Sequence, residues 1–250
     1  LDTPGPITQT VLDCLIMFDV LDGREGWQIR QDLEKDDGIY ALLSRGVAGL
    51  RLGCLTDSER QQCSDDVLAS YDMALDRLRV MGAEIIAFEN PVSYGDMADD
   101  NGMITAVEAF YNHGYLYKNP NLPMDEDVRA RMLSGGRYHA HDYFGVLQQR
   151  KETMQAFGES MRGFDALVTP SSTSTAPILT EVDQALSPGY FTRPFNFLGM
   201  CGLSLPIDLA SNGMPTSLQI VGRAHDEAIC LRIGSTLEND LSPIGRPDLT

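Results

Sequence analysis

The stretch that decides the fold comprises residues 50–88 and reads LRLGCLTDSERQQCSDDVLASYDMALDRLRVMGAEIIAF. Its two ends, Leu50–Leu55 and Ala83–Phe88, are short apolar runs of the kind that form buried strands. Between them, Asp65–Met81 carries apolar residues at intervals of three and four, and Gly82 follows at the position where helices commonly end. A strand, a helix and a second strand with short connections predict a right-handed βαβ crossover and two parallel strands.

The residues before this unit predict one apolar helix and one polar connection. We expect a helix over Thr8–Leu21, with Thr8 as its N-cap and with Ile7 and Leu12 as a hydrophobic staple. Apolar residues lie nearly all round it, so we expect the helix to be buried. The following segment, Arg24–Ser44, is rich in Asp and Gly and predicts an exposed connection that carries a short helical turn.

Two further parts of the chain have a helical pattern. Met97–Met161 is predicted to be mostly helical, with a break at Asn119–Pro123, a weak point at Gly135–Gly136 and a long helix from about His141 to Arg162. The last helix is predicted over Asp226–Glu238, with its first residue as the N-cap.

The third part of the chain predicts strands that make the sheet mixed. Phe164–Thr169 has the composition of a buried strand, and the Ser/Thr/Pro-rich segment Pro170–Tyr190 predicts a long loop with a functional role or flexibility. Leu203–Asp208 and Ser217–Val221 flank an Asn212–Gly213 turn, which favours a hairpin and hence antiparallel pairing.

The charge balance argues against polyanionic partners. The chain has 36 acidic and 19 basic residues and a net charge of −17. A nucleic acid or an anionic membrane surface would be repelled, so we expect neither as a direct partner. The most apolar window, Val11–Leu21, is interrupted by two aspartates and is too short to span a bilayer.

The cysteines and the absence of a targeting pattern predict a cytoplasmic protein. The cysteine count is five, an odd number, and no C-x-x-C pair occurs, which favours reduced and mostly buried thiols. No basic segment precedes an apolar run, so we expect no signal peptide in this chain.

Common cofactor, metal and nucleophile motifs are missing from the sequence. It has no Walker A loop, G-x-G-x-x-G, H-E-x-x-H or G-x-S-x-G, so no cofactor is predicted. His139 and His141 with Asp142 suggest a metal site, but helix positions i and i+2 point to different faces, and we expect no metal there.

Hydroxyl groups gather in one loop without a base to activate them. A hydroxyl nucleophile needs a histidine or a lysine that burial keeps neutral. None of the three lysines has apolar neighbours that would lower its pKa: Lys35, Lys118 and Lys151. We therefore expect no catalytic residue in this chain, and the loop serines are expected to bond to local backbone: Ser171, Ser172 and Ser174.

Three stretches resemble a known family. They are Leu1–Gly23, which opens LDTPGPIT; Phe164–Pro177, which opens FDALVTP; and Phe191–Gly222, which contains PFNFLG, LSLP, GMP and LQIVG. In this order they resemble the C-terminal half of the amidase signature family. The resemblance implies an α/β fold with a mixed β-sheet flanked by helices on both faces. It also implies that residues 1–250 are the C-terminal part of a single domain whose N-terminal part is missing from this chain.

The resemblance also implies a chemistry. Members of the family hydrolyse carbon–nitrogen amide bonds with a Ser–Ser–Lys triad, and all three triad residues precede the segment that matches Leu1–Gly23. The nearest imitation of the family's Gly-Gly-Ser signature, Ser134–Gly136, has the wrong order and the wrong place. We therefore expect the triad to lie upstream of this chain and the isolated chain to be inactive.

The family's acyl-pocket wall suggests candidate substrate-binding residues. By resemblance, that wall would come from Arg131–Tyr143 and from the Thr169–Ala176 loop. The candidates are Tyr138, Asp142, Tyr143 and Thr169, with helix surface and loop capping as their alternative roles. The chain has Gly199-Met200-Cys201-Gly202 where the family usually has Gly-x-Pro-Ala, a departure that bears on substrate class more than on fold.

Three functions stay open at this point. The first is an amidase that acts on a small-molecule amide. The second is the glutaminase component of a tRNA-dependent amidotransferase, its A subunit, which releases ammonia from glutamine for a partner protein. The third is a non-catalytic half-fold module for binding or assembly. Since half of a sheet would leave an open edge and a bare apolar face, we expect the chain to pack against its own N-terminal half or to self-associate as a homo-oligomer.

Overall fold

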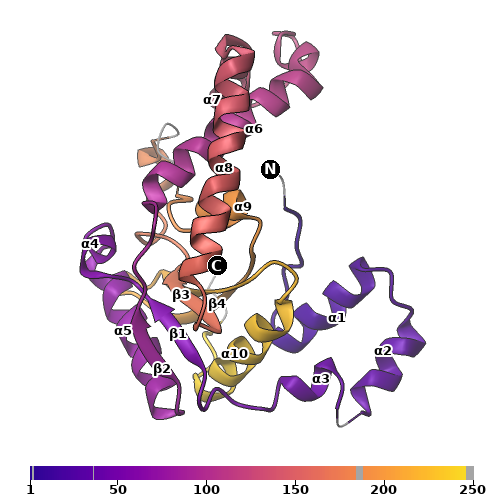
Figure 1. Cartoon of the computed structure of the whole chain (residues 1–250), viewed down its shortest axis with the longest axis vertical. Helices are drawn as coiled ribbons and strands as arrows, with labels where there is room; N and C mark the ends of the chain where they lie inside the picture. The colour runs from indigo at the N-terminus through magenta and orange to yellow at the C-terminus, as the bar shows by residue number, and fades with distance from the viewer. Residues whose placement is uncertain (2, 36, 184–187, 246–250) are drawn as a thin grey trace. The chain divides into compact units, whose positions relative to one another are not determined.

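The computed structural model describes residues 1, 3–35, 37–183 and 188–245 (Figure 1). Three segments singled out in the sequence include residues outside those described: Asp2 in the family-like stretch Leu1–Gly23, Asp36 in the predicted connection Arg24–Ser44, and residues 184–187 in the predicted loop Pro170–Tyr190. The chain divides into two compact units. The helical unit comprises Leu1–Thr3, Glu89–Arg162 and Pro177–Gly199, and the sheet unit comprises Pro4–Phe88, Gly163–Ala176 and Met200–Thr250.

The sheet unit contains a five-stranded mixed sheet with the strand order β2-β1-β3-β5-β4. β1 pairs in parallel with β2 and β3, whereas β5 runs antiparallel to both β3 and β4. The predicted parallel pair, the hairpin and the mixed α/β class are therefore confirmed. The strands are β1 Arg51–Cys54, β2 Glu84–Ala87, β3 Ala166–Pro170, β4 Cys201–Leu209 and β5 Pro215–Gly222.

The crossover helix α5, Asp65–Val80, follows the short helix α4, Asp57–Arg60, and packs on strands of the sheet. Its apolar stripe is buried as the periodicity predicts, and Gly82 follows it with φ +94°, a conformation that glycine adopts without strain. The C-terminal helix α10, Glu227–Asp240, packs on β4 and β5. Its N-cap is Asp226, as predicted.

The first helix, α1, spans Val11–Leu21 and differs from its prediction in three ways. Thr10 caps it, because its Oγ1 accepts a hydrogen bond of 3.0 Å from the N–H of Asp13. Ile7 is fully exposed, so the predicted staple with Leu12 does not form. The helix is buried on one face only, where it packs on α10; four large side chains stay exposed: Leu12, Met17, Val20 and Leu21.

The predicted exposed connection after α1 contains two helices, α2 at Gly26–Leu33 and α3 at Ile39–Leu42. Each has one buried anchor, Ile29 and Tyr40 respectively. The Tyr40 hydroxyl donates a hydrogen bond of 2.8 Å to the buried carboxylate of Asp19 on α1. These three helices therefore form one packed group beside α10 (Figure 1).

The helical unit is organised around the long helix α6, Tyr94–Tyr117. It contacts the other main elements of the unit, and α8 lies against it in Figure 1. The predicted weak point at Gly135–Gly136 has a steric cause: a Cβ at Gly135 would collide with the backbone carbonyl of Ala106 on α6. The elements are α7 Glu126–Leu133, η1 Ser134–Arg137, α8 Ala140–Ser160, η2 Leu179–Glu181 and α9 Arg193–Leu198.

An aromatic cluster forms the core of the helical unit. Phe195 on α9 meets Tyr94 on α6 and Phe157 on α8 in edge-to-face arrangements, with ring centroids 5.5 and 6.3 Å apart. α9 ends at Gly199, which has φ +68°. Across the part of the chain that the structure describes, no helix combines the length and apolar character needed to span a bilayer.

Candidate functional site

Three of the four predicted substrate-binding residues lie where η1 leads into α8, in the helical unit. Tyr138 directly follows η1 and has a half-exposed side chain. Asp142 lies in the first turn of α8, and its Oδ2 accepts a hydrogen bond of 2.9 Å from the N–H of His139. The carboxylate therefore caps the helix, which is the alternative role considered for it.

Tyr143 is held against α6 by a hydrogen bond. Its hydroxyl donates to Oε1 of Glu108 at 3.0 Å, and Oε2 of the same carboxylate accepts from the nitrogen of Leu1 at 3.0 Å. Burial and the Glu108 hydrogen bond raise the pKa of Tyr143. The neutral hydroxyl keeps lone pairs that can accept a hydrogen bond from a ligand.

Thr169 lies in the sheet unit, in β3, and is only 1% exposed. Its Oγ1 donates to the carbonyl of Pro170 at 2.9 Å and accepts from Nε2 of Gln219 at 3.1 Å. The hydroxyl thus joins β3 to the neighbouring β5. The structure groups Tyr138, Asp142 and Tyr143 in one unit and places Thr169 in the other.

The loop after β3 is fastened to the rest of the sheet unit. The hydroxyls of Ser171 and Ser204 lie 2.7 Å apart, and Nδ2 of Asn212 donates to Oγ1 of Thr175 at 3.1 Å. Within the described residues, no hydrogen bond joins a lysine to a serine. No group of three His, Cys, Asp or Glu side chains in this part of the chain is placed to hold a metal ion.

Sequence reasoning missed a cavity of about 310 Å³ in the helical unit, to which α6, α7 and α9 contribute walls. Two arginines line it, Arg131 and Arg193, and neither forms an ion pair with any residue that the structure describes. Burial and the positive charge of Arg131 lower the pKa of Arg193. The lining residues are Leu1, Asn101, Gly102, Thr105, Arg131, Met132, Thr192, Arg193 and Asn196.

Amide side chains hold one wall of this cavity in place. The buried Asn101 donates from Nδ2 to the carbonyl of Arg193 at 3.3 Å and to Oδ1 of Asn196 at 3.4 Å. Asn196 in turn donates to Oγ1 of Thr3 at 2.6 Å. Two cationic side chains beside fixed amides suit an anion or a carbonyl oxygen. The predicted pocket wall Arg131–Tyr143 includes two of the lining residues, Arg131 and Met132, but the sequence did not indicate the residues from α6 and α9.

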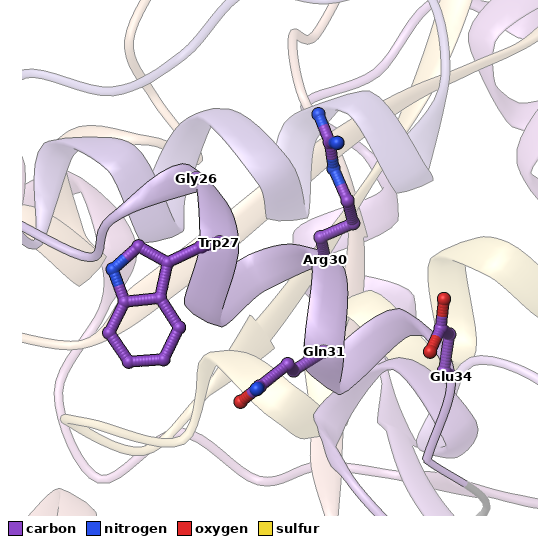
Figure 2. Close-up of a pocket in the computed structure, with 5 residues that line it drawn as sticks. All are labelled: Gly26, Trp27, Arg30, Gln31 and Glu34. Atoms are coloured by element: carbon purple, nitrogen blue, oxygen red, sulfur yellow. The ribbon is translucent and has the colours of Figure 1, made fainter.

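A second hollow, of about 490 Å³, lies on α2. Figure 2 shows that the lining residues come from this one helix and from Glu34 directly after it, and that the Arg30 side chain points away from the Trp27 ring. Because no other element supplies an opposing wall, this hollow lacks converging polar groups and we assign no chemistry to it.

Solved structures with the same fold are amidases and related enzymes. A crystal structure of an amidase superposes with a TM-score of 0.79 at 24% identity, covering 95% of this chain and 52% of the other. The A subunit of the glutamyl-tRNA(Gln) amidotransferase of Thermotoga maritima gives 0.66 at 21% identity, covering 95% and 52%. At these identities the likeness shows the fold.

Curated relatives carry two kinds of name. The A subunit of the glutamyl-tRNA(Gln) amidotransferase of Nitratidesulfovibrio vulgaris is 30% identical over 99% of this chain and 57% of its own length. An amidase of Pseudomonas putida is 29% identical over 95% and 53%. The chain spans about half the length of the relatives it matches. The family model named Amidase matches residues 1–231, most of the sequence, and the chain therefore belongs to the amidase signature family.

Proposed function

We propose that the protein containing this chain hydrolyses carbon–nitrogen amide bonds, and that residues 1–250 are the C-terminal part of its single amidase domain. The family match over residues 1–231 is the observation that carries this proposal. The Ser–Ser–Lys triad would be supplied by residues upstream, since the lysines described here have other surroundings. Lys35 bonds to Asp32 at 2.6 Å, and Nζ of Lys118 lies 4.7 Å from the centroid of the Phe110 ring.

The proposed substrate is a small amide with a polar or anionic end. The guanidinium groups of Arg131 and Arg193, which have no ion-pair partner among the described residues, support this, because a ligand oxygen would offset their mutual repulsion. We also propose substrate contacts for the residues suggested by the family resemblance, each acting within its own unit: Tyr138, Asp142, Tyr143 and Thr169. The five free cysteines support a cytoplasmic location.

The proposed partner of this chain is its own N-terminal half. β4 is the last strand of the sheet and pairs only with β5 among the described strands. An unpaired strand edge favours the addition of another strand. The exposed apolar side chains of α1 are a second surface that the N-terminal half, or a second copy of the chain, would cover.

A second candidate function is that of the glutaminase component of an amidotransferase, favoured by the names of several relatives. Substrate panels distinguish the two. A free amidase would hydrolyse aryl or aliphatic amides by itself, whereas a glutaminase component would release ammonia from glutamine and depend on a partner protein.

The test uses the longest natural gene product that contains this chain, the 250-residue chain alone, and a mixture of the chain with its N-terminal half. We expect amide hydrolysis, blocked by a serine-directed inhibitor, in the first and in the mixture and none in the chain alone. Turnover by the isolated chain would place the nucleophile within these residues. Absence of turnover in the long protein on every amide and on glutamine would favour the non-catalytic module.

A further inference from the structure

Two cysteines that are 29 positions apart in the sequence place their sulfur atoms 3.9 Å apart. Cys201 is the first residue of β4 and is partly exposed. Cys230 lies in the first turns of α10 and is 2% exposed. No C-x-x-C motif marks such a pair, because β5 and its turns separate the two residues along the chain.

The end of β5 makes room for both sulfurs. Gly222 is the strand partner of Cys201, and a Cβ at this position would lie 2.9 Å from Sγ of Cys230 and 3.1 Å from Sγ of Cys201. The chain then turns into α10 through His225, whose φ of 63° is unusual for a residue with a side chain. A side chain larger than hydrogen at Gly222 would therefore displace the pair.

Contacts on both sides of Cys201 act on its ionisation: its Sγ donates a hydrogen bond of 3.1 Å to the carbonyl of Arg223, and the Sγ of Cys230 lies on its other side. The hydrogen bond from the Cys230 thiol lowers the pKa of Cys201, and the backbone amides of Asp226 and Gly222 act in the same direction. Burial and the charge of Glu227 oppose them. The N-terminus of α10 adds a partial positive charge nearby. The hydrogen bond to Cys201 and burial raise the pKa of Cys230, so the two thiols have unequal acidities.

We propose that Cys201 and Cys230 form a redox-active dithiol that hydrogen peroxide oxidises reversibly to an intrachain disulfide. This site is independent of the proposed amide hydrolysis. Cys201 is the attacking sulfur, because it is the more exposed and the better stabilised as a thiolate. Cys230 is the resolving thiol behind it.

The reaction balances in two steps. The Cys201 thiolate attacks one peroxide oxygen, the O–O bond breaks, and the released hydroxide takes a proton to form water while the sulfur becomes a sulfenic acid. The Cys230 sulfur then gives up its proton and attacks the Cys201 sulfur, the S–O bond breaks, and the hydroxide leaves with that proton as a second water. Two thiols and one peroxide thus give one disulfide and two waters, and a small dithiol reverses the change.

The other three cysteines are internal controls. Burial raises the pKa of Cys14, Cys54 and Cys63, in the last case to about 11. Among the described residues, none of them has a hydrogen-bonded cysteine partner. At neutral pH these thiols stay protonated and react slowly with peroxide or alkylating agents.

The first experiment treats the intact chain with one equivalent of hydrogen peroxide at neutral pH, alkylates the remaining thiols and digests with trypsin. Cleavage after Arg223 places Cys201 and Cys230 on different peptides, so mass spectrometry detects a disulfide as a linked pair. We expect this linked pair as the main product and its loss after dithiothreitol. Free thiols at both positions after excess peroxide would overturn the proposal.

Variants separate the two roles. In Cys230→Ser, Cys201 should stop at the sulfenic acid and be trapped by dimedone; in Cys201→Ser, Cys230 should stay reduced. Cys63→Ser is the matched control and should form the disulfide as the parent chain does. Oxidation of Cys230 in Cys201→Ser, at the parent rate, would contradict the assignment.

A measurement without substitutions covers the case of a variant that fails to fold. Native Cys201 should react with iodoacetamide roughly tenfold or more faster than Cys63 at neutral pH, and the difference should vanish in urea. Equal rates in the native chain, or a difference that persists in urea, would show that the fold does not activate Cys201.

Discussion

Tyr71 on α5 donates a hydrogen bond of 2.8 Å from its hydroxyl to the backbone carbonyl of Val168 in β3. The same hydroxyl accepts a hydrogen bond of 3.0 Å from the N–H of Leu55, just beyond the end of β1. One buried side chain thus joins the crossover helix to two neighbouring parallel strands, and it does so at 1% exposure.

Replacing Tyr71 by Phe should destabilise the sheet unit. The ring still fits, but two buried backbone groups lose a partner, which costs about 1–3 kcal/mol of unfolding free energy. Urea denaturation measures the change. Tyr115→Phe, at an exposed position on α6, is the control and should leave the midpoint unchanged. Equal midpoints for the parent and Tyr71→Phe would show that the hydrogen bonds contribute nothing net.

The helical unit should respond sharply to a methyl group at Gly135. Because the added Cβ would meet the carbonyl of Ala106, Gly135→Ala should push η1 off α6 and lower the melting temperature, at a cost of about 1–3 kcal/mol. Gly145→Ala on α8 is the matched control, since nothing lies within 4 Å of its added Cβ. That variant should be neutral or more stable, because alanine favours a helix. Similar melting temperatures for both variants would contradict the close approach.

Elements that depend on local pattern could be predicted from the sequence. The crossover over residues 50–88 is an example: the spacing from Val67 to Leu78 gives one buried stripe, and Gly82 ends the helix. The segment Arg24–Ser44 was predicted as an exposed connection with a short helical turn, and the structure shows two helices there instead of one turn. Each of its two helices buries one anchor residue. A single buried side chain such as Tyr40 does not produce the repeated spacing of apolar residues by which a helix is recognised in a sequence.

Features that depend on contacts between distant residues could not be predicted. Arg131 and Arg193 face one cavity, and Cys201 and Cys230 form one pair, only because the fold brings separate elements together. The exposure of α1 has the same origin. Its composition correctly indicates an apolar helix, but the number of neighbours that cover it depends on the rest of the chain.

Substitutions of the two arginines that line the cavity of the helical unit should weaken substrate binding without lowering stability. In the longer active protein, Arg193→Gln or Arg131→Gln should raise KM for an amide with an anionic end roughly tenfold or more, because a charged hydrogen bond is lost. Without ligand, Arg131→Gln should not destabilise the chain, since it removes repulsion from Arg193. Arg137→Gln, at an exposed position outside the cavity, is the control. Unchanged KM values in both cavity variants would exclude this cavity from substrate binding.

Alkaline pH should weaken the contact between Tyr40 and Asp19. Burial and the hydrogen bond to Asp19 raise the pKa of Tyr40 above the value of about 10 that a tyrosine has in an unfolded chain. The folded state therefore holds the phenolic proton more tightly, and this stabilisation is complete below pH 10 and declines as the pH rises toward the folded pKa. Urea midpoints of the parent and of Tyr40→Phe at pH 8 to 11 measure it. The difference between the urea midpoints of the parent and of Tyr40→Phe should shrink above about pH 10. A difference that stays constant over this pH range would contradict the dependence of stability on the ionisation of Tyr40.

The exposed apolar face of α1 should drive association of the isolated chain. Val20 and Leu21 are 50% and 64% exposed, one turn from the exposed Met17, and Leu12 is exposed near the start of the same helix, which packs only through its other face. At about 25 cal/mol per Å² of apolar surface, covering a few hundred Å² gains several kcal/mol before the cost of association is subtracted, which favours a weak dimer whose population rises with protein concentration. Val20→Lys should therefore shift sedimentation toward the monomer, whereas Val80→Lys, at an equally apolar and more exposed position on α5, should not.

Adding the N-terminal half should suppress association of the parent chain if it covers the same face of α1. A monomeric parent chain that does not bind a hydrophobic dye would show that this face needs no partner and that residues 1–250 fold as a complete domain.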